Sequence, residues 1–240
     1  MQITDHIYKF SFFPNNIVQG ISTRYFGVLK KGKRVHTNNL KKFLKELNIP
    51  YTQTVLAGLV HGKDIALVND TTHNRIEHTD GLITTRKNIF LWIGTADCLP
   101  VVFYDNEQKI VGIAHAGYKG ILAGIIEEMI NKFITLGSKK KNLQVGIGPG
   151  IGVCCYNVPE ERIKMFEGRF PGVKVFEKRN GEYYLDLLKL VEHILTDEGI
   201  EKKNMESAGM CTKDHQHLFY SHRGSGRKLH DDFVTIIGQI

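Results

Sequence analysis

Short apolar runs alternate with polar turns along the first part of the chain, which is typical of strands rather than helices. One amphipathic helix interrupts them before Pro50, because apolar residues recur at helical spacing over residues 40–47. The early part is therefore predicted to be mostly β-structure. The predicted strands lie at residues 7–13, 17–23, 55–59, 65–68 and 81–84.

The middle of the chain predicts more strands and the clearest helix. Strands are expected at 88–94, 101–104 and 109–114, and an apolar stripe with helical period covers residues 121–134. We expect one helix, ended by Gly137, that packs this stripe on a sheet.

The last third mixes both kinds of element. A helix is expected after Pro159, and Asn180-Gly181 predicts a hairpin turn. Strands and helices do not alternate regularly, and no Pro/Ser-rich linker divides the chain, so we predict a single α+β domain over residues 1–240. The other predicted elements are strands at 143–147, 219–220 and 233–237 and a helix at 185–198.

The composition is that of a globular protein and does not indicate which reaction the chain performs. The chain has 240 residues, of which 42% are hydrophobic and 24% charged, as in ordinary globular proteins. No run approaches the ~18 apolar residues of a membrane span, and the first ten residues do not resemble a signal peptide. Four irregularly spaced cysteines are too few for a disulfide framework, so we expect a reducing, cytoplasmic location.

The net charge of +7 raises the question of a polyanionic partner. The basic residues are dispersed over apparent turns, with no basic helix and no basic stripe interleaved with aromatics. We therefore expect neither a nucleic acid nor a membrane as partner. A small anionic substrate such as phosphate is compatible with this surface.

Three residues that end apolar runs are the main candidates for chemistry: His61, Cys98 and His115. Two imidazoles and a thiolate supply three ligands of a tetrahedral zinc and leave the fourth position open for catalysis. The same Cys98 could instead be a nucleophile with a histidine as its base. Each residue, taken alone, could equally be structural.

Other candidates surround these three. Asp97 either orients His61 or His115 or caps a loop. Gly148–Gly152 lacks the Lys and Ser/Thr of a phosphate-binding P-loop, so it is either a tight turn or a backbone anion site. The candidate substrate-binding residues are Ser22, Arg24, Lys119 and Arg227, since hydroxyl and cationic groups suit phosphate oxygens.

Six segments in order resemble the motifs of one family, the bacterial YfiH/YlmD family. It is also called the polyphenol oxidase or laccase-domain family, and its mammalian relatives include FAMIN. The resemblance runs from about Gly20 to Arg227. The matching segments are Leu59–Gly62, Asp80–Thr84, Ala96–Pro100, His115–Gly120, Ile147–Tyr156 and Phe219–Arg223.

This resemblance implies a mixed β-sandwich with helices outside. It implies a zinc site at His61, Cys98 and His115, and purine nucleoside phosphorylase activity on adenosine, inosine and methylthioadenosine. It also implies adenosine deaminase activity, and copper-dependent phenol oxidation has been attributed to the family. Two positions depart from the family pattern: Leu59 replaces a Gln, and Tyr118-Lys119 replaces Trp-Arg, where Lys offers a point charge instead of a planar fork.

The resulting hypothesis is a zinc site, with copper as the alternative metal, beside a pocket for purine nucleosides. Inorganic phosphate, held by Arg24 or Arg227, would attack the anomeric carbon as the purine leaves. Deamination is expected as a side activity, because the usual zinc deaminase signature is absent. The oligomeric state does not follow from the sequence.

Three alternatives stay open. A metal-free cysteine hydrolase or deamidase would use Cys98 and His115. A copper-dependent phenol oxidase would need more histidine ligands than one such set supplies. A non-catalytic zinc-stabilised binding module would fill the fourth coordination position with protein, and the candidates for that ligand are Cys154, Cys155 and Cys211.

Overall fold

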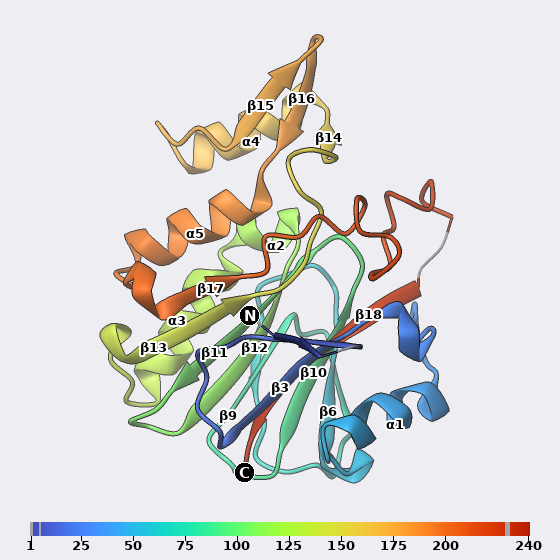
Figure 1. The fold of residues 1–240 in the computed structure, drawn as a ribbon. Helices are drawn as coiled ribbons and strands as arrows, with labels where there is room; N and C mark the ends of the chain where they lie inside the picture. The colour runs from blue at the N-terminus through green and yellow to red at the C-terminus, as the bar shows by residue number, and fades with distance from the viewer. Residues whose placement is uncertain (1, 5, 229–230) are drawn as a thin grey trace.

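Two β-sheets lie face to face at the centre of the computed structural model, which describes residues 2–4, 6–228 and 231–240 (Figure 1). Within these residues the larger sheet has nine strands, and its main path runs β1-β2-β3-β18-β10-β6-β8. Its strands are β1 (Gln2–Thr4), β2 (Ile7–Lys9), β3 (Ile17–Ser22), β4 (Lys30–Lys31), β5 (Arg34–Val35), β6 (Thr54–Gly58), β8 (Arg75–Glu77), β10 (Phe90–Thr95) and β18 (Asp231–Gln239).

The second sheet has six strands in the order β17-β13-β11-β12-β9-β7, and it contains the two strands nearest the candidate site. A small third sheet, β14-β16-β15, stands at the top of Figure 1 beside α4. The strands of these sheets are β7 (Ile65–Leu67), β9 (Gly81–Thr84), β11 (Leu99–Asp105), β12 (Ile110–Ala116), β13 (Leu143–Ile147), β17 (Met205–Ser207), β14 (Asn157–Val158), β15 (Phe176–Arg179) and β16 (Glu182–Leu185).

Alternation along β10 explains why the large sheet is buried on both faces. Leu91 and Ile93 pack between the two sheets, whereas Phe90 and Trp92 pack on the opposite face against α1 (Thr37–Glu46). Successive side chains of a strand point to opposite faces, so one apolar run serves two cores.

Strand β11 does the same for the smaller sheet. Val102 and Tyr104 face the large sheet, and Val101 and Phe103 face the helices. The helices on that side are α2 (Tyr118–Ala123), α3 (Ile125–Thr135) and α5 (Leu187–Asp197), and α4 (Glu160–Arg169) lies with the small third sheet. The predicted α+β fold, a mixed sandwich flanked by helices, is confirmed.

Two predicted elements are wrong. The helix expected over 121–134 is two helices, since Gly124 has φ +93° and ends α2 in the left-handed region before α3 begins. No strand forms at Phe219-Tyr220, which lie in the loop between β17 and β18. The short strands β8 and β17 carry no alternating pattern long enough to predict them.

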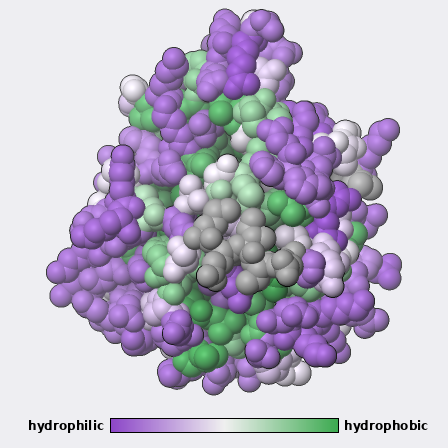
Figure 2. Space-filling model, in the orientation of Figure 1, coloured by the Kyte–Doolittle hydropathy of each residue, from purple (hydrophilic) through white to green (hydrophobic). Residues whose placement is uncertain are grey.

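The surface agrees with the dispersed charge of the sequence. Hydrophilic side chains cover the end of the molecule formed by α4 and the β15–β16 hairpin (Figure 2). In the described part of the chain, no helix combines the length and the apolar character needed to cross a membrane.

Candidate metal centre

His61, Cys98 and His115 converge at one point of the structure. Their nearest ligand atoms all lie within 4.8 Å of one another, and the two imidazole rings meet edge to face with centroids 4.8 Å apart. His115 lies in β12, and Cys98 immediately precedes β11, which pairs with β12 so that Leu99 faces Ala116. The antiparallel register of two strands thus brings a thiol and an imidazole together.

Gly117 leaves the space in which the three side chains meet. A Cβ at this position would lie 2.8 Å from Cys98 Sγ and 3.4 Å from a ring carbon of His61. The backbone of Gly117, with φ −83°, is one that any residue adopts. The glycine is required by the close approach of the side chains and not by its conformational freedom.

Asp80 fixes both histidines. Its fully buried carboxylate lies 2.8 Å from Nδ1 of His115 and accepts hydrogen bonds from the backbone N–H groups of Val60, His61 and Gly62 at 3.1, 2.8 and 2.7 Å. These bonds hold His61 in the left-handed region at φ +62°, a conformation uncommon for residues other than glycine. A carboxylate on one ring nitrogen is the usual partner of a metal-binding histidine, because it directs the other nitrogen to the metal.

The electrostatics of the site favour a thiolate. Burial opposes ionisation of Cys98, but the positive charge of His115 and hydrogen bonds from both histidines lower its pKa to about 6. Burial likewise opposes charging of His115, yet the Cys98 thiolate and Asp80 raise its pKa to about 9. Each of the two groups therefore favours the charged form of the other when no metal is bound.

These residues fit a metal with one open position. Two imidazoles and one thiolate form a donor set that suits zinc or copper. His115 is 3% exposed, Cys98 is half-buried and His61 is exposed, so the group opens to solvent on the His61 side. A ligand from solution can reach the centre from that side.

The structure corrects the orienting role considered for Asp97. Its carboxylate accepts hydrogen bonds from the Thr212 hydroxyl at 2.7 Å, the Ser221 hydroxyl at 2.6 Å and the Arg223 N–H at 2.6 Å. Asp97 thus ties the segment after β17 to the Cys98 loop, and Asp80 orients His115 instead. Asp80 is the first residue of Asp80–Thr84, one of the six segments that resemble the family's motifs. This resemblance was the feature of the sequence that could have indicated a role for Asp80.

The four predicted substrate-binding residues have different environments. Ser22 is a correction: it is fully buried, and its hydroxyl accepts a hydrogen bond from Val234 N–H, so it offers no surface to a substrate. The Arg24 guanidinium donates to the Gln216 carbonyl at 3.1 Å and lies over the Tyr220 ring. Lys119 lies at the start of α2 and Arg227 lies in the loop before β18, and both side chains are exposed.

Two arginines beside Tyr156, Arg162 and Arg223, were not among the residues predicted from the sequence. Arg162 donates to the Tyr156 hydroxyl at 3.3 Å and stacks over Tyr118, and Arg223 lies 5.2 Å from the Tyr156 ring. Burial, and then the positive charge of Arg227, lower the pKa of Arg223. Burial raises the pKa of Tyr156, although the charge of Arg162 opposes the effect. Arg162 lies over Tyr118, which follows the Gly117 packed against Cys98 Sγ, so this cationic group borders the metal centre.

The glycine-rich segment after β13 is a close-packed turn. The N–H groups of Gly148 and Ile151 donate to the carbonyls of Pro100 and Asp97 at 2.8 and 2.7 Å. A Cβ on Gly150 would lie 3.0 Å from the Asp97 carbonyl oxygen. Backbone carbonyls therefore occupy the N–H groups of Gly148, Gly150 and Ile151, which favours the tight turn over an anion site.

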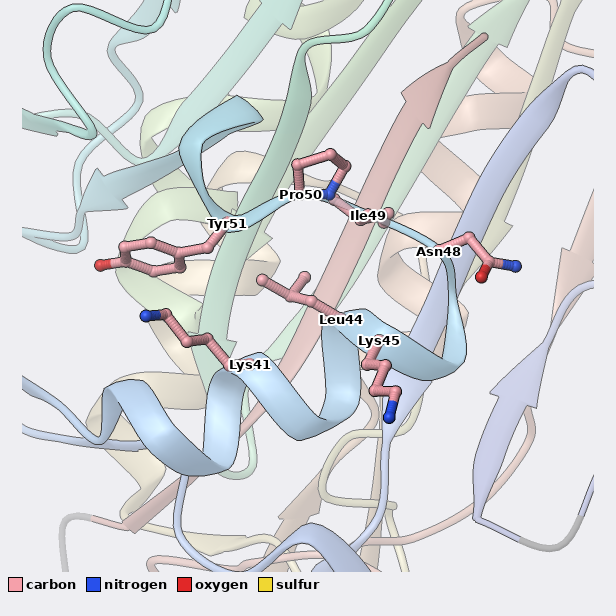
Figure 3. A pocket seen from close by; sticks show the side chains of 7 residues that line it. All are labelled: Lys41, Leu44, Lys45, Asn48, Ile49, Pro50 and Tyr51. Atoms are coloured by element: carbon pink, nitrogen blue, oxygen red, sulfur yellow. The ribbon is translucent and has the colours of Figure 1, made fainter.

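The remaining cysteines do not join the three-residue group. Cys154, Cys155 and Cys211 form a second group with Asp214, in which the ligand atoms lie within 4.8 Å of one another. A hollow of about 340 Å³ beside α1 shares no residue with either group (Figure 3). Its lining consists of Lys41, Leu44, Lys45, Asn48, Ile49, Pro50 and Tyr51.

The model of the family described as "Multi-copper polyphenol oxidoreductase laccase" matches residues 26–236. The chain belongs to this family. Its relatives include the Bacillus subtilis purine nucleoside phosphorylase YlmD, 31% identical over 222 residues that cover 85% of this chain and 80% of the relative. The human purine nucleoside phosphorylase LACC1 is 27% identical over 96% of this chain, which spans only 56% of the human protein.

Solved structures of similar proteins have the same fold. YlmD from Geobacillus stearothermophilus superposes with a TM-score of 0.90 at 26% identity, covering 100% of this chain and 98% of that one. YfiH from Bacillus licheniformis has a TM-score of 0.86 at 32% identity, covering 94% of each chain. The predicted resemblance to the YfiH/YlmD family is confirmed.

Proposed function

We propose that this chain is a metal-dependent purine nucleoside phosphorylase acting on adenosine, inosine and methylthioadenosine. The observation that carries the proposal is the convergence of His61, Cys98 and His115 beside the arginines around Tyr156. Relatives that bear this activity in their names support it. Zinc is the proposed metal because it suits two imidazoles and a thiolate, with copper as the alternative.

In the proposed reaction, a phosphate oxygen bonds to C1′ of the ribose as the C1′–N9 bond breaks. The purine leaves with the electron pair of that bond and gains a proton, and ribose 1-phosphate is the second product. When bound, the metal supplies Lewis acidity toward a substrate oxygen.

Arg162, Arg223 and Arg227 are the proposed phosphate-binding residues. Burial, and then the charges of Arg227 and Arg162, lower the pKa of Arg223, and a bound anion would offset this repulsion. The planar guanidinium groups can bind phosphate oxygens in pairs. Arg24, Lys119 and Asp97 stay predictions as substrate-site or catalytic residues.

Product analysis tests the reaction class directly. The zinc-loaded chain is incubated with adenosine, with and without phosphate, and the products are separated chromatographically. Adenine and ribose 1-phosphate formed only with phosphate would support phosphorolysis. Inosine formed without phosphate would make deamination, the proposed side activity, the main reaction instead.

Two variants test the assigned roles. Cys98→Ala is expected to abolish zinc retention at the three-residue group together with turnover, and a fully active variant would contradict the proposal. Arg223→Gln should raise the KM for phosphate at least tenfold with little change in nucleoside KM. Arg34→Gln, on exposed β5, is the matched control and should leave both constants unchanged.

A metal-free cysteine hydrolase is the second candidate, favoured by one specific observation. Cys98, His115 and Asp80 form a row in which the carboxylate lies 2.8 Å from His115 Nδ1, as in a nucleophile–base–carboxylate triad. Activity that resists chelators but is lost on thiol alkylation would favour this candidate over the phosphorylase.

The phenol oxidase has less support from the donor set. The two metal-ligand groups of the described residues contain only two histidines between them, fewer than several copper centres need. Phenol oxidation that stops when oxygen is removed, with no nucleoside cleavage, would restore it.

A further inference from the structure

The second group of metal-ligand side chains joins two segments that are far apart in sequence. Cys154 and Cys155 lie in the turn between β13 and β14, and Cys211 and Asp214 lie in the loop after β17. The Asp214 carboxylate is 2.9 Å from Cys154 Sγ and 3.0 Å from Cys155 Sγ. The two adjacent thiols therefore contact the same carboxylate. Cys154 faces its Oδ2 atom and Cys155 faces its Oδ1 atom.

The backbone brings these segments together without help from the side chains. Gly150 pairs with Cys211 in a parallel bridge, and the Thr212 N–H donates to the Gly150 carbonyl at 2.9 Å. A Cβ on Gly152 would lie 3.1 Å from both Cys154 Sγ and Cys211 Cβ. The glycine thus leaves room for the sulfur atoms to approach one another.

Three sulfur atoms and one carboxylate supply four ligands, the number that a tetrahedral zinc needs. Thiolates select zinc among the common divalent ions, and a closed set of four protein ligands is typical of structural sites. Arg179 donates to the carbonyls of Val153 and Cys154 at 3.5 and 3.4 Å, which places a positive charge beside an anionic centre.

We propose that Cys154, Cys155, Cys211 and Asp214 bind a second zinc ion, which is structural. Three zinc–sulfur bonds form as the thiols release their protons to solvent, and the ionised carboxylate supplies the fourth ligand without any change of oxidation state. The ion would clamp the turn after β13 to the loop after β17. Because Asp97 is bonded to Thr212, this clamp also supports the Cys98 loop.

Metal counting on the full chain tests the proposal independently of activity. The reduced protein is dialysed against zinc and then against buffer, and zinc per chain is measured by mass spectrometry. The native chain should retain two zinc ions, and Cys98→Ala should retain one. Cys154→Ser and Asp214→Asn, chosen because both positions are exposed, should each retain one.

Cobalt distinguishes the two sites and adds a second readout. In the Cys98→Ala background, Co²⁺ should give the intense thiolate charge-transfer absorption of a three-sulfur site, and Cys154→Ser should weaken it. Glu167→Gln, an exposed change on α4, is the control and should leave metal count and spectrum unchanged.

A single zinc in the native chain that is lost completely in Cys98→Ala and kept in Cys154→Ser would overturn the proposal. A disulfide among the three cysteines that persists in the presence of zinc under reducing conditions would also overturn it. Neither result bears on the phosphorylase, whose test is the product analysis.

Discussion

Asp80 is the residue whose replacement most sharply tests how the candidate metal centre is held. Asn has nearly the same shape as Asp but keeps only one acceptor oxygen. In the structure, Oδ1 faces His61 N–H and His115 Nδ1, and Oδ2 accepts from the N–H groups of Val60 and Gly62. In Asp80→Asn, either orientation of the amide therefore removes the acceptor from two of these four groups.

The expected loss of stability follows from that count. A buried donor left without its partner costs about 1–3 kcal/mol, so two of them cost roughly 2–6 kcal/mol. Metal affinity should fall about 10- to 100-fold, the usual effect of losing a carboxylate behind a metal ligand. If the amide nitrogen takes the place of Oδ2, the N–H groups of Val60 and Gly62 lose their acceptor and the His61 loop is loosened. If it takes the place of Oδ1, the His61 N–H loses its acceptor and the amide donates to His115 Nδ1, which reverses the tautomer of that ring.

Asp97→Asn is the matched control because Asp97 is also a buried carboxylate with several hydrogen bonds. Its partners lie in the segment after β17, not on either histidine. Chemical denaturation should show a loss of stability in both variants. Competition with a zinc-binding dye should show a clearly larger loss of affinity for the three-residue centre in Asp80→Asn than in Asp97→Asn, because Asp97 touches no metal-ligand side chain.

The reasoning fails if Asp80→Asn binds zinc at the three-residue centre as tightly as the native chain. It also fails if the two variants weaken zinc binding equally, since the effect would then come from general loosening. Measuring both in the Asp214→Asn background removes any contribution from the second group of ligands.

Two further predictions concern the site and the core. Gly117→Ala should lower zinc affinity at least tenfold with the fold retained, because its Cβ would lie 2.8 Å from Cys98 Sγ. Gly168→Ala is the contrasting change, because this position faces open space on α4, and it should stabilise the protein by about 0.5–1 kcal/mol. Burial, assisted by the charge of Glu206, raises the pKa of Tyr8 to about 12, and among the described residues its hydroxyl has no hydrogen-bond partner. The pKa of Tyr8 is higher in the folded than in the unfolded state, so the folded state favours the neutral phenol. The free energy of unfolding should therefore be unaffected by Tyr8 below pH 10 and should fall by roughly 2–3 kcal/mol as the pH rises toward 12. Tyr8→Phe should flatten the alkaline loss of stability measured by urea denaturation, and an unchanged pH profile would contradict the assignment.

Much of the fold could be predicted because local patterns agree with the tertiary structure. The hairpin through Asn180-Gly181 and the helix after Pro159 form as expected, since turn and capping chemistry act within a few residues. The break at Gly124 was missed because the apolar stripe continues across it, and one glycine conformation interrupts the helix without changing the pattern.

The candidate site was predictable only in part, for a different reason. His61, Cys98 and His115 each end an apolar run, so their type and context mark them in the sequence. The position of Asp80 beside His115 depends on the pairing of β9 with β12, where Ala114 faces Gly81. Strand partners far apart in sequence are not set by local pattern, and the arginines around Tyr156 come together for the same reason.

The two buried carboxylates divide the support of the site between them. Asp80 binds the His61 loop and the His115 ring, whereas Asp97 binds the segment that carries Arg223. Cys98 follows Asp97 directly, so the metal-ligand thiol and the proposed phosphate-binding segment are joined through one residue. We therefore expect a ligand that displaces the Arg223 segment to shift the Cys98 loop through Asp97, and zinc affinity measured with and without phosphate would test this coupling.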